Sequence, residues 1–122
     1  MTISQFLVVF LGGGLGSTLR YAMGQMLAGQ TRGGFPLATF LCNVGGCFLI
    51  GLFSALTVRL GWSPQWRLLL TVGLCGGFTT FSTLTNESLA MLQSGAYGML
   101  ALYMVGSLAA GLLAVWVGHS VA

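Results

Sequence analysis

Charged side chains are scarce in this sequence. Only 4% of its 122 residues are Asp, Glu, Lys or Arg, whereas 56% are hydrophobic. A soluble domain usually has about 25% charged residues, so this chain lacks the polar residues that would cover a water-facing surface. The composition therefore predicts an integral membrane protein whose outer surface contacts membrane lipid.

Lysine and aspartate are absent, and Glu87 is the single acid. The formal net charge of +3 comes from four separated arginines, which are Arg20, Arg32, Arg59 and Arg67. Nucleic-acid binding requires clustered basic residues, so the sequence predicts no nucleic-acid partner. The sequence also lacks a recognisable nucleophile–base set or a cluster of metal-binding side chains, which argues against an enzyme.

The cysteines and the N-terminus exclude two further features. The three cysteines fall in apolar stretches and form no C-x-x-C pair, so neither a zinc site nor a disulfide framework is predicted. We expect Cys42, Cys47 and Cys75 to fill space between helices. Because the first arginine is Arg20, the charged start of a secretory signal is missing, and the first apolar stretch is expected to be retained.

Apolar stretches long enough to cross a bilayer make up most of the chain. A spanning helix needs about 20 mostly apolar residues, and four such stretches are predicted at residues 4–28, 36–58, 65–92 and 97–117. Pro36 and Pro64 stand where new helices would begin, a position that tolerates proline. The expected fold is all-α and integral to the membrane, with residues 1–122 forming a single four-span domain.

Glycine is abundant, with 20 residues, and parts of its spacing suit close helix packing. Gly12 and Gly16, and likewise Gly73 and Gly77, form the small-x-x-x-small pattern that lets membrane helices approach each other. Four helices make a thin bundle, so conduction or transport is expected to need more than one copy.

The arginines are balanced between the two sides of the predicted bundle. Arg20 and Arg32 fall toward the side of the first and third connections, and Arg59 and Arg67 fall toward the other. Membrane orientation follows the difference in Lys/Arg number between the two sides, so the sequence contains only a weak signal for orientation. Either another cue decides the orientation, or the chain inserts both ways. We favour the second, in which two opposed copies pair as an antiparallel homodimer.

The third predicted span combines glycines with hydroxyl side chains. Residues 73–87 have the sequence GLCGGFTTFSTLTNE. Paired glycines lower helix propensity, and Ser and Thr side chains compete for backbone hydrogen bonds. Unpaired backbone at membrane depth is tolerated only inside protein or beside a cavity. We therefore predict a helix break at residues 76–80, with carbonyls suited to Na⁺ and with hydroxyls suited to an anion from Thr79, Thr80, Ser82 and Thr83.

Two other polar residues are costly inside a membrane. Asn43 stands alone in the second predicted span, where an amide needs a hydrogen-bond partner. It could bridge two helices, or its NH₂ group could donate to a small anion without trapping it as an arginine would. Glu87 is a functional candidate because it is a lone acid near the end of a span. The alternative is a partner for an arginine.

Three segments together resemble the signature segments of the CrcB/Fluc family of fluoride channels. They are GGGLGSTLRY at residues 12–21, the segment around Asn43, and GLCGGFTTFS at residues 73–82. The resemblance covers essentially the whole chain and implies passive fluoride efflux that protects a bacterium from fluoride. It implies a multi-pass inner-membrane protein that forms a dual-topology homodimer with two pores. It also implies a structural Na⁺ on the dimer axis, held by the backbone carbonyls of Gly76 and Thr79.

The resemblance also implies which side chains line each pore. Asn43 and Phe81 would face the ion, the phenylalanine through the positive edge of its ring. Hydroxyls of Ser82 and Thr83 belong to the same predicted ion pathway. Leu84, however, stands where the family usually has a second phenylalanine, so a poorly conducting relative is an alternative.

The fourth span and the two charged residues complete the predicted ion pathway. Tyr103 and Ser107 fit a track of hydroxyls that Gly111 cuts short; an interfacial tyrosine and a helix-contact serine are the alternatives. Glu87 resembles a family glutamate that relays or gates ions. Arg20 resembles a family arginine that draws anions into a vestibule, and the alternative is a role in topology or dimer packing.

Two other classes of membrane protein share some of these features. A proton-coupled exporter of the small multidrug-resistance kind is also small, four-spanning and dual-topology, but it needs a carboxylate in the first span, and none is present here. A scaffold subunit that transports nothing would not need a glycine-broken helix beside an intramembrane amide. The sequence therefore favours the fluoride channel.

Overall fold

The structure is a computed structural model that describes residues 1–28 and 34–122, and every regular element within them is helical. Three spans are single helices: α1 (Ile3–Met26), α2 (Leu37–Leu60) and α6 (Tyr97–Val121). The remaining span consists of α3 (Pro64–Arg67), η1 (Leu68–Cys75), α4 (Gly76–Phe78) and α5 (Phe81–Gln93). All four spans are long and apolar enough to cross a membrane. The predicted all-α, four-span architecture is confirmed. Arg32 lies outside the described residues.

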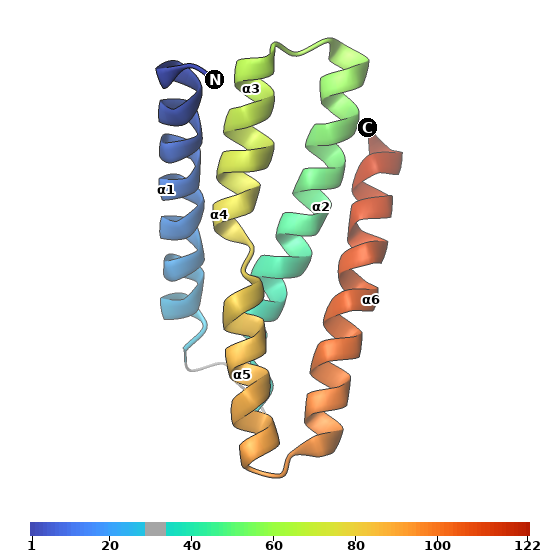
Figure 1. Cartoon of the computed structure of the whole chain (residues 1–122). Helices are drawn as coiled ribbons and strands as arrows, with labels where there is room; N and C mark the ends of the chain where they lie inside the picture. Colours follow the sequence, from blue (N-terminus) through green and yellow to red (C-terminus); the bar gives the residue numbers. More distant parts are fainter. Residues whose placement is uncertain (29–33) are drawn as a thin grey trace.

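Both chain termini and the α2–α3 connection lie at one end of the bundle, and the α5–α6 connection lies at the other (Figure 1). Local chemistry sets several helix ends. Thr2 and Gln5 form a capping box, in which the Thr2 hydroxyl accepts from the Gln5 N–H at 3.3 Å. Gly61 ends α2 with a φ of 64°, a left-handed conformation that glycine adopts without strain. Pro64 occupies the first turn of α3, as predicted.

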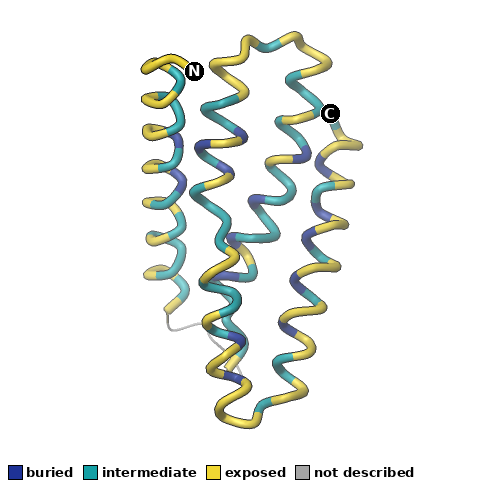
Figure 2. The backbone as a smooth tube through the Cα atoms, in the orientation of Figure 1, coloured by how far each residue is buried: buried dark blue, intermediate teal, exposed yellow. Residues whose placement is uncertain are grey.

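The helices pack in two close pairs, α1 with η1 and α4, and α2 with α6. Glycines make both contacts possible. A Cβ added at Gly12 would lie 2.6 Å from the Leu69 carbonyl oxygen, and one added at Gly118 would lie 3.0 Å from the Leu52 nitrogen. Buried residues accordingly form a narrow line along the facing sides of the helices (Figure 2). The core of each pair is therefore backbone against backbone, as small residues allow in membranes.

The outward helix faces are apolar and exposed (Figure 2). Large exposed side chains occur along α1 and α6, for example Phe10, Leu108 and Trp116. In water such continuous apolar surface would cause aggregation. This distribution of side chains fits a bundle surrounded by lipid or by further copies of itself.

The third span is interrupted between α4 and α5 (Figure 1). Thr79 (φ −88°, ψ 156°) and Thr80 (φ −151°, ψ 116°) are extended, so the break lies within the predicted residues 76–80. The two unwound residues are threonines, whereas Gly76 stays helical with φ −61° and ψ −38°. Gly77 is also helical and packs against Gly13 of α1, where a Cβ would meet the Gly13 backbone, so this glycine serves close helix packing and not the break.

Candidate functional site

The helix break is closed by one side chain of α2. The Thr80 N–H donates to Oδ1 of Asn43 at 2.6 Å, and Nδ2 of Asn43 donates to the Thr80 carbonyl at 3.1 Å. Both backbone groups of Thr80 are therefore satisfied by a single amide, which replaces the missing helical partners. The bridging role that the sequence left open for Asn43 is present. Its Nδ2 carries a second N–H, and donation of that hydrogen to an anion stays a prediction.

The clamp on Thr80 also changes the end of the preceding helix. In a continuous helix the Thr80 N–H would donate to the Gly76 carbonyl, but here it is engaged by Asn43. Gly76 is exposed. The N–H and the hydroxyl of Thr79 both donate to the Cys75 carbonyl, at 3.0 and 2.9 Å. Neither Thr79 group therefore replaces Thr80 as a donor to the Gly76 carbonyl. The Gly76 carbonyl in the last turn of α4 thus lacks the hydrogen bond that the Thr80 N–H would make to it in a continuous helix.

Arg20 contacts the same turn from α1. Its Nε–H donates to the Gly77 carbonyl at 3.0 Å, and the contact is partly buried. A cation near the C-terminal end of a helix is favourable because the helix dipole is negative there. The structure thus places this arginine beside the break, on the α1 side.

Hydroxyls gather at the start of α5. The Thr80 hydroxyl accepts from the Thr83 N–H at 3.2 Å and so caps the helix. The same hydroxyl donates to the Thr83 hydroxyl at 3.0 Å and lies 3.4 Å from that of Ser82. The structure thus brings these three predicted hydroxyls together at the positive end of the α5 dipole, where anions are favoured.

A cleft of about 590 Å³, here called the break cleft, opens beside the interrupted span. Predicted site residues that line it are Asn43, Gly76, Thr79, Thr80, Phe81 and Ser107, together with Leu84. Phe81 is 78% exposed. The Ser107 hydroxyl is buried and has no hydrogen-bond partner among the described residues. An unpaired buried hydroxyl is costly, which marks this wall of the cleft as a place where a ligand or water could bind.

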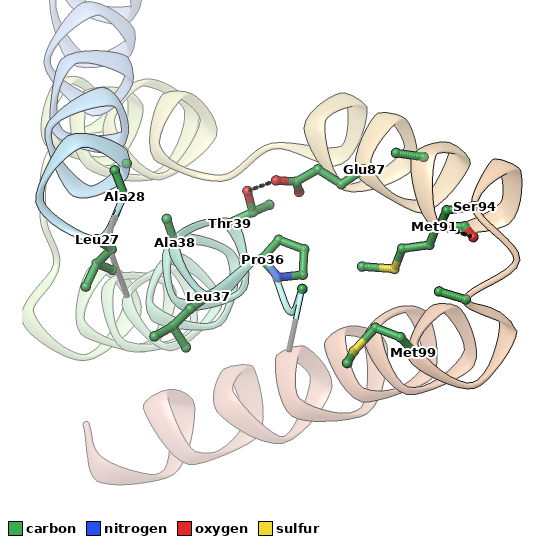
Figure 3. A pocket seen from close by; sticks show the side chains of 14 residues that line it. Leu27, Ala28, Pro36, Leu37, Ala38, Thr39, Glu87, Met91, Ser94 and Met99 are labelled. Carbon is green, nitrogen blue, oxygen red and sulfur yellow. Dashed lines mark hydrogen bonds between the residues drawn. The ribbon is translucent and has the colours of Figure 1, made fainter. Parts of the chain in front are cut away.

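Glu87 lines a second cleft of about 720 Å³, the acid cleft, near the other end of α5 (Figure 3). The Tyr103 hydroxyl donates to its Oε1 at 2.7 Å, and the Thr39 hydroxyl donates to its Oε2 at 3.0 Å. Within the described ranges, the hydrogen-bond partners of this carboxylate are therefore hydroxyls. Tyr103 is 0% exposed, so the alternative of an interfacial tyrosine is wrong.

Thr39 is a site residue that the sequence analysis did not identify. It lies four residues before Asn43 on α2, and a separation of four places two side chains on the same helix face. Tyr103 and Ser107 have the same separation on α6. This spacing from residues already selected is the signal that could have identified Thr39.

The polar side chains form three short rows, here called ladders, each made of residues three or four positions apart along one span. Their members are Thr39 and Asn43 on α2, Thr80, Thr83 and Glu87 in the third span, and Tyr103 and Ser107 on α6. Steps of three or four residues advance about 4.5–6 Å along a helix. The hydrogen bonds from Asn43 to Thr80 and from Thr39 and Tyr103 to Glu87 tie the ladders together. The result is a line of polar groups between the break cleft and the acid cleft.

Comparison with known proteins shows sequence similarity over nearly the whole chain. The family described as "CrcB-like protein, Camphor Resistance (CrcB)" matches residues 7–119. A protein of Phocaeicola vulgatus is 48% identical over 116 residues, covering 95% of this chain and 96% of the relative. A Thermus thermophilus protein is 47% identical over 119 residues, covering 98% and 94%.

The names of these relatives describe one activity. The two proteins above, and one of Paramagnetospirillum magneticum that is 44% identical over 93% of this chain and 91% of the relative, each bear the name "Fluoride-specific ion channel FluC". The relatives are therefore named as ion channels, a class distinct from enzymes.

Proposed function

The chain belongs to the CrcB-like protein family, and on that premise we propose that it is a fluoride-specific ion channel. Passive efflux through it would protect a bacterial cell from fluoride, with the channel in the inner membrane. One structural observation carries the proposal. The break in the third span leaves neutral donors, the Asn43 amide and the α5 hydroxyls, at or beside a cleft within an apolar bundle.

Neutral donors suit the chemistry of a small, strongly hydrated anion. Fluoride must exchange its water for other hydrogen-bond donors to cross an apolar layer. The second N–H of Asn43 and the unpaired Ser107 hydroxyl both border the break cleft. Because neither group is charged, an ion can bind and leave again. Phe81 would add the positive edge of its ring at the same cleft.

We propose that two copies pair antiparallel, and the exposed apolar side chains around the break cleft support the presence of a second copy. The cleft opens on the side of the bundle, and exposed apolar side chains from α5 and α6 border it: Phe81 (78%), Leu108 (77%) and Leu112 (72%). A second copy would cover these side chains and complete the wall around the ion. An opposed copy, related by a two-fold axis in the membrane plane, would produce two equivalent pores.

The residues at the break also fit a structural Na⁺. Gly76 and Thr79 border the break cleft, and the helical partner of the Gly76 carbonyl is engaged by Asn43. Carbonyls at the C-terminal end of a half-helix are typical Na⁺ ligands in membrane proteins. We propose that these two carbonyls and their symmetry mates hold the ion. A bound Na⁺ would supply positive charge that links the two copies.

Fluoride efflux from liposomes tests the proposed function. Purified protein is reconstituted into vesicles loaded with potassium fluoride, and efflux is started with a potassium ionophore and followed with a fluoride electrode. We expect fluoride release well above that of protein-free vesicles and no chloride release from matched chloride-loaded vesicles. Fluoride release no faster than from protein-free vesicles, with protein present in the membrane, would refute the channel.

A further inference from the structure

An arginine inside an apolar helix requires an explanation. Arg20 lies within α1, and its side chain is only partly exposed. Charged groups in a membrane span are costly and face partners or water. The contact that the structure gives Arg20 is the hydrogen bond from its Nε–H to the Gly77 carbonyl, 57 residues away in sequence.

The position of Gly77 makes this contact informative. Gly77 belongs to the last turn of the half-helix that ends at Phe78, where carbonyls lack partners from a following turn. It packs against Gly13 of α1. Its neighbours Gly76 and Thr79 instead border the break cleft. Arg20 therefore binds the carbonyl on the α1 side of this turn and leaves the carbonyls beside the cleft to other ligands.

We propose that Arg20 is a positioning residue, which holds the Gly77 carbonyl through its Nε–H and thereby fixes the end of the half-helix that presents the Gly76 and Thr79 carbonyls to the break cleft. The proposal rests on the proposed function, because it assigns those two carbonyls to Na⁺. It differs from attraction of anions by the positive charge of Arg20, because the required feature is a hydrogen-bond donor at a fixed reach.

Substitution of Arg20 by glutamine tests the hydrogen-bond donor separately from the positive charge. Counted from Cα, Nε2 of glutamine occupies the same place along the chain as Nε of arginine, so Arg20→Gln can donate to the same carbonyl without a charge. Arg20→Met has similar length and no donor. Arg20→Lys keeps the charge but moves the nitrogen one atom farther out. Arg67→Gln, at an exposed position in α3, is the matched control for loss of a charge.

Stabilisation by Na⁺ gives a readout that does not depend on ion flux. The midpoint of thermal unfolding of the purified protein in detergent is measured while NaCl replaces N-methyl-D-glucamine chloride. We expect Arg20→Gln and Arg67→Gln to keep the wild-type Na⁺ response. In Arg20→Met the half-saturating Na⁺ concentration should rise about tenfold, which corresponds to about 1.4 kcal/mol. Equal loss in the Gln and Met variants with retention in Lys would overturn the proposal, because charge would then be the required feature.

Hydrogen exchange at the break tests the positioning role without Na⁺. The amides of Thr79 and Thr80 are hydrogen-bonded to Cys75 and Asn43. Exchange of peptides covering residues 76–83 should be at least about threefold faster in Arg20→Met and unchanged in Arg20→Gln, with α6 as the internal reference. Unchanged exchange in Arg20→Met would overturn the positioning role. A wild-type protein without fluoride efflux or Na⁺ response would refute the proposed function, and the exchange data would still decide the role of Arg20.

Discussion

At the residue scale, the Asn43 amide has one observed role, in the helix break, and one proposed role, in ion passage. Its Oδ1 and one N–H hold the backbone of Thr80, and Asn43 also lines the break cleft, where its second N–H is proposed to donate to the anion. The bridging role is thus present in the structure, and the proposed role in ion passage is compatible with it. A side chain at position 43 that makes only one of the two hydrogen bonds to Thr80 should change both the helix break and the passage of ions.

Asn43→Asp should lower fluoride efflux from liposomes by at least about tenfold. A carboxylate can still accept from the Thr80 N–H, but it cannot donate to the Thr80 carbonyl, and an unmatched buried polar pair costs about 1–3 kcal/mol. Its negative charge also repels fluoride. Asn86→Asp, which introduces the same charge at an exposed position of α5, is the control. Efflux from Asn43→Asp equal to that of the control would contradict both roles of the amide.

Leu84→Phe should raise fluoride efflux about two- to tenfold, as expected for one added aromatic contact of about 0.5–1.5 kcal/mol. Leu84 lines the break cleft together with Phe81, so a ring at position 84 adds a positive edge at that cleft. Leu89→Phe, at an exposed position on the same helix, controls for added aromatic surface. The same change in rate for both variants, or slower efflux from Leu84→Phe alone, would contradict a pore role for residue 84.

At the element scale, the sequence predicts the spans and the helix break but not the details of the break. Apolar stretches, divided by charges and loop residues, place the four spans, with a largest difference of four residues at the end of α6 (residue 117 predicted, 121 observed). The composition of residues 76–80 predicts an interruption. Propensity does not give which residues unwind: Gly76 and Gly77 stay helical, and Gly77 packs on Gly13 of α1. Local propensity contains no information on such contacts between distant segments.

The same limit applies to the candidate site. Asn43, Glu87 and the hydroxyl residues could be selected because polar groups are costly in hydrocarbon. Their partners could not, since the bond from Arg20 to Gly77 and the bond from Thr39 to Glu87 join residues 57 and 48 positions apart. A threonine also satisfies its own hydroxyl within a helix at little cost, so Thr39 gave no signal by itself.

Gly12→Ala should destabilise the bundle, whereas Gly14→Ala should not. A Cβ at Gly12 would lie 2.6 Å from the Leu69 carbonyl oxygen, and nothing lies within 4 Å of one at Gly14. Overpacking costs about 1–3 kcal/mol, while an alanine in a helix gains up to about 1 kcal/mol over glycine. Thermal unfolding in detergent should show a lower midpoint for the first variant only. Equal midpoints would mean that α1 does not pack on η1 through this surface.

At the scale of the whole molecule, the orientation signal depends on where Arg20 lies. The sequence alone assigns two arginines to each side of the membrane. In the structure Arg20 is bound to Gly77 beside the helix break and is not a loop residue. Arg59 and Arg67 lie at the α2–α3 end. With Arg32 on the other side, as the sequence predicts, the difference between the sides is one charge. Orientation responds to the arginines near the ends of the spans, and one charge is a weak bias.

Labelling from both sides of the membrane should therefore find both orientations. In a background with the three cysteines replaced, Gln65→Cys and Gln93→Cys place single thiols at exposed positions at opposite ends of the bundle (Figure 1). In intact cells an impermeant maleimide should label a fraction near one half at each position, because each end faces outward in about half of the copies. The rest should react after the membrane is permeabilised. Nearly complete labelling at one position with none at the other would establish a single orientation, and an antiparallel dimer could not then form.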